Sequence, residues 1–104
     1  MFEINWQPLS ELMFSEEIHF ISRKWNQFEA EKFALLVLEN LERLSKNVTI
    51  GIYKTKYNCY SLVISKQTTL YYKIIENKAQ IDLILFWNNK QNSIFLKTML
   101  QESH

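Results

Sequence analysis

The sequence is short of the residues that most often mark catalytic and cofactor-binding motifs. Its 104 residues include one glycine, one proline, one cysteine and two histidines. The single glycine, Gly51, excludes a glycine-rich loop that cradles phosphate. The single cysteine, Cys59, cannot form an internal disulfide, which favours a reducing compartment. Because Cys59, His19 and His104 are far apart in the sequence, they lack the spacing of a metal site, and we expect neither a metal nor a cofactor.

Long apolar runs are also missing. No stretch approaches the ~20 apolar residues of a membrane-spanning helix, and the N-terminus lacks the basic flank and apolar run of a secretory signal. We therefore expect a cytoplasmic protein without membrane association. Apolar residues make up 47% of the chain and charged residues 22%, which is typical of a globular protein. The length fits one domain, residues 1–104.

Arginine is scarce, and the charge is unevenly distributed. Lysine supplies ten of the twelve basic residues. Residues 1–45 carry eight acids and four bases, a net charge of −4, whereas residues 46–104 carry three acids and eight bases, a net charge of +5. This asymmetry can favour an anionic partner for the second half, although acidic helices beside basic strands are the commoner cause. Arginine binds phosphates and bases better than lysine, so the composition does not indicate strong nucleic-acid recognition.

The hydrophobic periodicity predicts an α+β domain. Residues 2–6 alternate as in a short strand, and residues 9–25 and 28–45 have helical spacing with only a short break between them, which predicts an antiparallel helical hairpin. Beyond residue 47 the period changes to two. There we expect, in order, a loop or weak edge strand at 53–56, an antiparallel meander of strands at 59–65, 69–76 and 79–87, and a tail or short helix at 93–104.

Alternation divides the meander into two faces. The helical hairpin should cover one face, since the sheet has no other way to bury it; this core face comprises Tyr60, Leu62, Ile64, Leu70, Tyr72 and Ile74. The opposite face is small, mixed and partly apolar, and comprises Cys59, Ser61, Val63, Ser65, Thr69, Tyr71, Lys73, Ile84 and Phe86. We expect a partner protein to cover this second face.

The stretch LILFWNNKQN, residues 83–92, changes abruptly from apolar to polar. Its first half is typical of a buried strand. Trp87, Asn89, Lys90 and Gln91 are typical either of a strand end that reaches water or of the rim of a recognition site. Lys54 and Lys56 also have two interpretations. They are typical of a charged strand edge that prevents aggregation, or they contact a phosphate or a partner.

Several pieces of sequence, taken in order, resemble one known family. They are Ile4-Asn5-Trp6 followed by Pro8, the segment from Glu17 to Trp25, the helix positions Ala30, Phe33 and Leu44, the strand Leu70 to Ile74, and the segment from Leu85 to Asn92. Together they span nearly the whole chain and resemble the RelE/ParE superfamily of bacterial type II toxins, ParE-like members most of all. The resemblance implies the element order β-α-α-β-β-β(-α), with a helical hairpin on one face of an antiparallel sheet.

The resemblance also implies a toxin that is neutralised by a cognate antitoxin. RelE-like members cleave messenger RNA on the ribosome, and ParE-like members are associated with inhibition of DNA gyrase. Nuclease members carry basic residues on the open face of the central strands, and the matching positions here are Ser61, Val63 and Thr69. None of these is basic, so a ribonuclease would need lysines relocated to other positions.

We therefore expect a ParE-like toxin that inhibits growth by binding a cellular target and is not an enzyme. DNA gyrase is the target that the resemblance favours. The alternatives are a RelE-like ribonuclease and a non-toxic binding protein with the toxin fold. The candidate residues for contacts to the target or antitoxin are Lys54, Lys56, Val63, Tyr71, Lys73, Phe86, Trp87, Asn89, Lys90 and Gln91.

Overall fold

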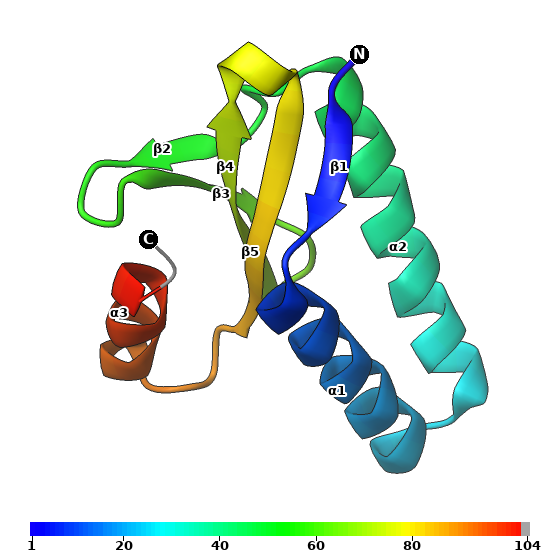
Figure 1. Ribbon diagram of the computed structural model, residues 1–104. Coiled ribbons are helices and arrows are strands. Elements are labelled where there is room, and N and C mark those ends of the chain that lie inside the picture. Colours follow the sequence, from blue (N-terminus) through cyan, green and yellow to red (C-terminus); the bar gives the residue numbers. More distant parts are fainter. Residues whose placement is uncertain (103–104) are drawn as a thin grey trace.

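The computed structural model describes residues 1–102 and contains three helices and a five-stranded sheet (Figure 1). The elements follow one another as β1 (Glu3–Trp6), α1 (Pro8–Lys24), α2 (Gln27–Lys46), β2 (Ile52–Lys54), β3 (Cys59–Val63), β4 (Thr68–Ile75), the 3-10 turn η1 (Glu76–Lys78), β5 (Gln80–Asn88) and α3 (Ser93–Glu102). The predicted α+β class is confirmed. No helix among the described residues is long and apolar enough to cross a membrane.

The strands lie in the order β1-β5-β4-β3-β2. β3, β4 and β5 pair antiparallel, as the predicted meander requires. The segment predicted as a loop or weak edge strand forms the edge strand β2, which also pairs antiparallel with β3. β1, however, lies beside β5 in parallel, so the whole sheet is mixed rather than antiparallel. A parallel neighbour needs a long connection instead of a tight turn. The chain between β1 and β5, which includes the helical hairpin, supplies that connection.

The helical hairpin of α1 and α2 packs on one face of the sheet. Leu62, Leu70 and Tyr72 from the predicted core face are buried against Val37 and Leu44 of α2. Ile64 is buried in the same cluster, and Tyr60 and Ile74 pack at its edge. The predicted core face of the meander is therefore confirmed.

The single glycine lies where the chain passes close to the sheet. A Cβ atom on Gly51 would come within 2.6 Å of the Ser61 carbonyl oxygen and the Tyr72 hydroxyl oxygen. That hydroxyl accepts a hydrogen bond from the Gly51 amide at 3.2 Å and donates one to the Val48 carbonyl at 2.9 Å. Only glycine allows this close approach, which fixes the segment between α2 and β2 against the sheet.

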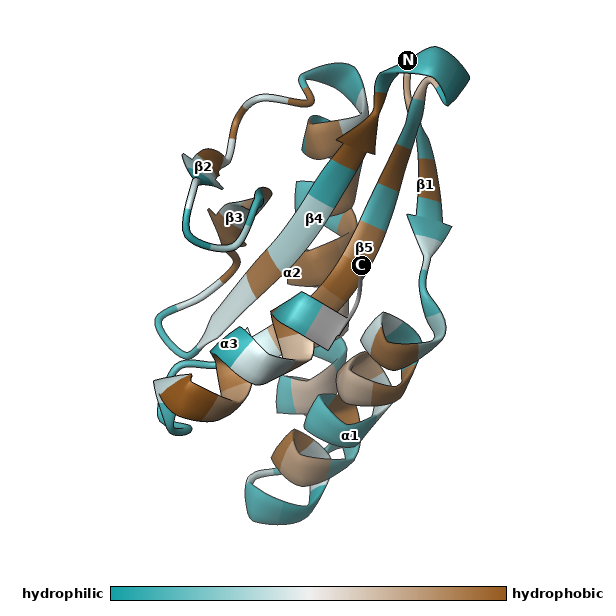
Figure 2. Ribbon diagram, turned by 60° about the vertical axis from the view of Figure 1, so that its left-hand side comes forward, coloured by the Kyte–Doolittle hydropathy of each residue, from teal (hydrophilic) through white to brown (hydrophobic). Residues whose placement is uncertain are grey.

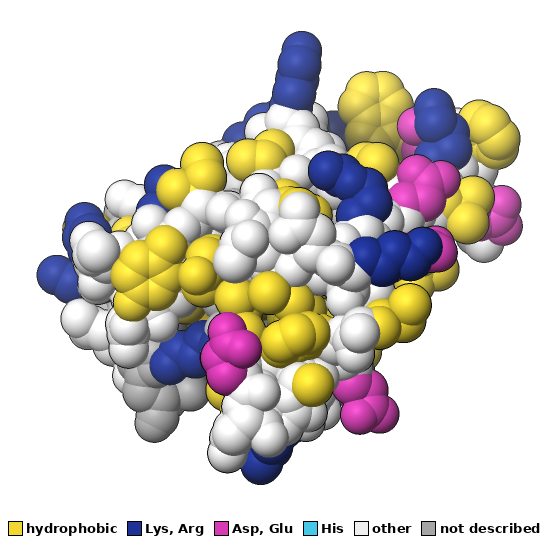
Figure 3. Space-filling model, turned by 90° about the horizontal axis from the view of Figure 1, so that it is seen from above, with side chains coloured by type: hydrophobic (Ala, Val, Ile, Leu, Met, Phe, Trp, Pro, Cys, Tyr) yellow, Lys and Arg dark blue, Asp and Glu magenta, His cyan; other side chains and the backbone are white. Residues whose placement is uncertain are grey.

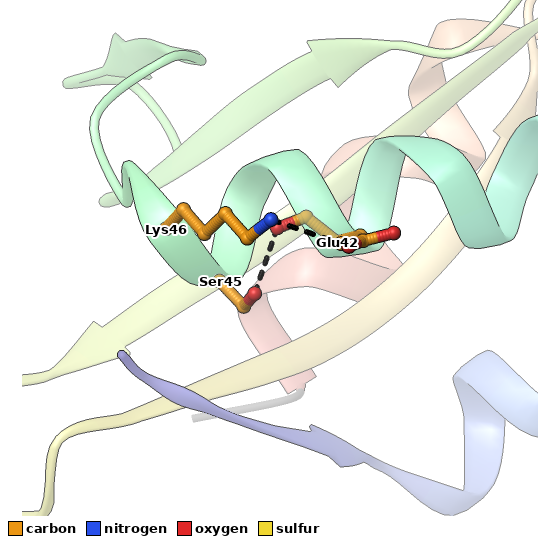
Figure 4. A network of polar contacts seen from close by, with 3 residues as sticks. All are labelled: Glu42, Ser45 and Lys46. Carbon is orange, nitrogen blue, oxygen red and sulfur yellow. Dashed lines mark hydrogen bonds and ion pairs between the residues drawn. The ribbon is translucent and has the colours of Figure 1, made fainter.

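Both ends of α2 are stabilised by local contacts. At its start, the Asn26 side chain accepts a hydrogen bond from the Glu29 amide at 2.8 Å. In its last turns, Lys46 forms an ion pair with Glu42 at 3.2 Å and the Ser45 hydroxyl donates to the Glu42 carbonyl oxygen at 2.7 Å (Figure 4). The side chain of Lys46 also places a positive charge at the negative end of the helix dipole.

A β-bulge interrupts β5 at Ile84. Tyr71 of β4 pairs with Leu85, but the next residue, Tyr72, pairs with Leu83, which leaves Ile84 as an extra residue. A bulge of this kind shifts the alternation of side chains by one position. Leu83 and Phe86 consequently lie in the core under the helical hairpin, whereas Ile84, Leu85 and Trp87 lie in a cluster on the opposite face. The expectation that Phe86 shares a face with Tyr71 and Ile84 is therefore wrong.

α3 covers part of the second sheet face. Leu96 and Leu100 of α3 are buried against Tyr71, Leu85 and Trp87, and Figure 2 shows α3 in front of the sheet, on the side away from α2. The chain itself thus buries Tyr71 and Ile84, which we expected a partner to cover. The predicted tail or short helix is a helix over Ser93–Glu102, and residues 103–104 of that segment lie outside the described residues.

The bulge predicts a large energetic role for Phe86. Its ring lies 5.6 Å from that of Trp6 and 5.8 Å from that of Phe14, between centroids. We expect Phe86→Ala to lower the free energy of unfolding by about 3–5 kcal/mol, because it leaves a cavity in the core. Phe95→Ala, at a position on α3 that is 63% exposed, serves as the control and should change it by less than about 0.5 kcal/mol. Urea denaturation of both variants measures the difference, and equal effects would contradict the bulged register.

Candidate functional site

The structure separates the candidate residues into several places. Tyr71 and Trp87 are buried under α3, and Phe86 lies on the other side of the sheet. Val63 of β3 is exposed. It pairs with Thr69 of β4, which pairs in turn with Trp87 of β5, so the three residues form one row across the sheet. These residues therefore do not form one continuous surface.

A groove between α1 and α3 is the main concave feature near the predicted stretch. Its apolar half encloses about 620 Å³ and has Met13 and Trp87 among its lining residues. Leu12 of α1 and Phe95 of α3 line the same space, and both are exposed. Large exposed apolar side chains around a concavity are typical of a surface that binds another molecule.

The groove continues into a polar half. This part encloses about 500 Å³ and shares Met13, Glu16 and Gln91 with the apolar half. The lining here is more polar than in the apolar half. It also includes Glu17, His19, Phe20, Arg23, Phe86 and Asn88. We call the two halves together the α1–α3 groove. Among the sequence candidates, Phe86, Trp87 and Gln91 line it.

The Glu17 carboxyl is the titratable group most affected by this environment. Partial burial raises its pKa above the ordinary value of 4.5, and a hydrogen bond with the Asn88 side chain acts in the opposite direction. Desolvation disfavours the charged carboxylate, so the groove presents a carboxyl group that is costly to ionise. A donor from a bound partner would stabilise the ionised form at this point.

The turn after β5 uses two asparagines for its own structure. Asn89 accepts a hydrogen bond from the Thr69 hydroxyl at 2.9 Å, and its amide nitrogen donates to the Lys66 carbonyl at 3.3 Å. The Asn88 side chain accepts from the backbone amide of Lys90 at 2.9 Å. Asn89 therefore joins the end of β5 to the turn between β3 and β4. Lys90 is exposed beside it.

A second polar arrangement crosses the sheet on the face that carries α3. Lys54 pairs with Cys59, and Lys73 pairs with Asp82, which in turn pairs with Asn5 of β1. Asp82 accepts hydrogen bonds from Asn5 at 2.9 Å and from Gln80 at 2.7 Å. We call these residues the polar row: Lys54, Cys59, Lys73, Asp82 and Asn5. Lys56 lies outside the row, in the turn between β2 and β3, with its ammonium group 5.6 Å from the ring of Tyr57.

Cys59 in the polar row has the character of a core residue. Its side chain is buried, and burial raises the pKa of its thiol to about 11, while the charge of Lys73 acts in the opposite direction. A thiol with so high a pKa is a poor nucleophile at neutral pH. No group of three or more acidic, histidine or cysteine side chains suited to a metal ion occurs within residues 1–102.

Sequence reasoning missed most of the α1–α3 groove. The sequence indicates Glu17 and Arg23 only as part of the segment that resembles the toxin family, and it indicates no function for Leu12. Leu12 gave a signal, because it is a large apolar residue outside the main apolar stripe of its helix. Phe95 gave none, because it shares helical spacing with Met99. The sequence could not reveal that these two positions, one on α1 and one on α3, line the same space.

Comparisons with known proteins do not assign a family. No protein-family model matches the chain, and no curated protein matches it.

The raised pKa of Glu17 predicts a pH-dependent contribution to stability. A carboxyl whose pKa is higher in the folded protein than in the unfolded chain stabilises the fold when protonated, and this stabilisation is lost as the pH rises through the folded-state pKa. We expect Glu17→Gln to raise the midpoint of thermal unfolding at pH 7 relative to the wild type. The difference should shrink as the pH falls toward 4.5 and should be smallest below that value.

Glu16→Gln is the matched control, since Glu16 is the exposed neighbour of Glu17 on the same helix. Differential scanning calorimetry of the three proteins across the acidic range measures the effect. A pH-independent difference between Glu17→Gln and the wild type would contradict the assigned role of burial.

Proposed function

We propose that the protein is the toxin of a bacterial type II toxin-antitoxin system, of the ParE-like kind, which inhibits growth by binding a cellular target. The observation that supports this proposal is the order β1-α1-α2-β2-β3-β4-β5-α3, which matches the order implied by the resemblance except for the additional short edge strand β2. DNA gyrase is the target that a ParE-like toxin implies, and a cognate antitoxin is the implied partner.

The central strands support binding rather than catalysis. At the positions that match the basic residues of nucleases, Ser61 and Thr69 are buried, and the Thr69 hydroxyl is hydrogen-bonded to Asn89. Val63 is exposed but has no group that can transfer a proton. Cleavage of RNA requires side chains that move protons and stabilise a developing negative charge. None of these three side chains supplies that chemistry.

The α1–α3 groove is the surface on which we place binding. Its apolar half accommodates the apolar side chains of a partner helix, and Glu16, Glu17 and Arg23 in the polar half offer charged contacts of both signs. A helix in a groove is a common mode of recognition, with anchors spaced by three or four residues. This placement replaces the sheet face of Tyr71 and Ile84, which α3 covers.

A RelE-like ribonuclease is the second candidate, and the polar row favours it. Lys54 of β2 and Lys73 of β4 lie on one sheet face, separated by β3. Strand spacing puts their backbones about 10 Å apart, a distance at which two long side chains can reach one phosphate. These would be the relocated lysines that a nuclease requires.

Growth assays test the toxin proposal and the groove together. Induced expression in bacteria without the antitoxin should arrest growth, and loss of plasmid supercoiling would identify gyrase as the target. We expect Leu12→Glu and Phe95→Glu to reduce target affinity by about tenfold or more and to relieve the arrest, because each places a charge in the apolar half. Ile52→Glu, on the exposed edge strand β2, is the control and should arrest growth like the wild type.

The outcomes separate the alternatives. An absence of arrest at full expression would favour the non-toxic binding protein over either toxin. Arrest with unchanged supercoiling and cleaved transcripts would favour the ribonuclease. Arrest that survives both groove variants would place binding elsewhere.

The lysines of the polar row give a direct test of the ribonuclease. If the chain cleaves messenger RNA, Lys54→Ala and Lys73→Ala should each reduce the cleavage rate by about a hundredfold or more, since each removes a cation next to the developing charge. Primer extension on ribosome-bound transcripts measures the rate, and Lys97→Ala on α3 serves as the control. For a ParE-like toxin both lysine variants should keep the arrest and leave transcripts intact.

A further inference from the structure

The outer face of α2 carries apolar residues where a surface helix normally carries only polar ones. Ala30, Val37 and Leu44 point into the core. On the opposite side of the helix, Phe28 is 65% exposed and Leu35 is 60% exposed. They are seven residues apart, so they lie along one line of the helix. A helix buried against a sheet on one side gains nothing from such residues on its solvent side.

A shallow groove runs beside this line. It encloses about 770 Å³ and lies against α2, the end of α1 and Gln67 of the turn between β3 and β4. Leu35 and Leu36 line it, and Glu29, Lys32 and Glu39 provide its charged positions. Figure 3 shows hydrophobic side chains among basic and acidic ones at the right-hand end of the molecule, where the helical hairpin lies. We call Glu29, Lys32, Leu35, Leu36, Glu39 and Arg43 the α2 strip.

The charges of the α2 strip complement those of a second, antiparallel copy. Glu29, Lys32, Leu36, Glu39 and Arg43 are spaced by three or four residues and therefore follow one side of the helix. If two α2 helices pair antiparallel about Leu35 and Leu36, Lys32 of each copy lies next to Glu39 of the other. Glu29 likewise lies next to Arg43 of the other copy. Two-fold symmetry forms each contact twice, as an isologous interface requires.

We propose that the α2 strip is a homodimer interface in which the α2 helices of two copies pack antiparallel. Leu35 and Leu36 lie at its centre, and the Lys32–Glu39 and Glu29–Arg43 pairs flank them. The antiparallel arrangement also aligns the dipoles of the two helices favourably. Within one copy, the Lys32 ammonium group lies 3.8 Å from the Glu29 carboxylate and 5.6 Å from the centroid of the Phe28 ring. These contacts are at the exposed surface and are weak, so Lys32 can reorient toward the partner.

The length of α2 sets the strength of this dimer. A helix of 20 residues is about 30 Å long, and one pair of such helices gives an interface at the small end of specific protein complexes. We therefore expect reversible association with a dissociation constant on the order of micromolar. The interface is separate from the α1–α3 groove, and the dimer does not depend on the proposed toxin function.

Analytical ultracentrifugation of the full chain tests the dimer. The wild type should pass from monomer to dimer as its concentration rises through the micromolar range. Leu35→Glu should weaken association by about tenfold or more, because it places two like charges at the centre of the interface. Leu12→Glu, at a similarly exposed position on α1, is the matched control and should associate like the wild type.

Charge exchange distinguishes a second copy from any other occupant. Lys32→Glu and Glu39→Lys should each weaken the dimer, and the double variant should restore it, because only a symmetric pairing returns opposite charges to both contacts. A Leu35→Cys variant should form a disulfide-linked dimer under mild oxidation, whereas Leu12→Cys should not. The native Cys59 is buried and does not compete.

A chain that stays monomeric at every concentration would overturn the proposal, even if Leu35→Glu abolished capture of some other protein. A dimer that survives Leu35→Glu, or a charge-exchanged variant that fails to recover, would overturn it as well.

Discussion

The β-bulge at Ile84 is the constraint on which the rest of the structure depends. One extra residue in β5 moves Phe86 to the face beneath the helical hairpin and Trp87 to the face beneath α3. Without it, the strict alternation of β5 would place Leu85 and Trp87 under the hairpin and leave Phe86 on the other side. Phe86 fills the space between Trp6 and Phe14, and Trp87 gives α3 an aromatic surface on which to pack. A single local irregularity thus supplies an aromatic residue to each of two cores.

The same bulge shapes the α1–α3 groove. Trp87 lines its apolar half and Phe86 its polar half, so the two consecutive aromatic residues contribute to different parts of one concavity. β5 ends at two asparagines with different contacts. Asn88 contacts Glu17 and the backbone amide of Lys90. Asn89 is hydrogen-bonded to Thr69 and to the turn between β3 and β4. In LILFWNNKQN, the apolar residues thus pack in the two cores, and polar residues that follow lie at the α1–α3 groove.

Local patterns predicted the elements of this fold, because each depends on the periodicity of its own residues. The helical hairpin, the meander and its core face all follow from spacings of three to four or of two. The parallel pairing of β1 with β5 and the position of α3 depend on contacts between distant segments, so no local pattern encodes them. The bulge is the hardest case: LILFW is apolar throughout, and such a run contains no polar residue to reveal where the alternation changes. The bulge therefore explains why Phe86 lies on the other face, whereas α3 covers Tyr71 and Ile84 of the predicted partner surface.

The distribution of lysines bears on whether the protein binds or catalyses. The acidic half of the sequence forms the helical hairpin, and most of the basic half forms the sheet and α3, so the charge asymmetry becomes a difference between layers. Around the sheet, however, the basic residues are distributed among two strands, the three turns that join β2 to β5, and the turn after β5. The only acid in the polar row, Asp82, is already held by Asn5 and Gln80, and the only thiol, Cys59, is buried with a raised pKa. Lys54 and Lys73 can hold an anion there, but no neighbour in the row is suited to take up a proton. The α1–α3 groove, in contrast, combines apolar area with charged groups of both signs, and these are the components of recognition between proteins.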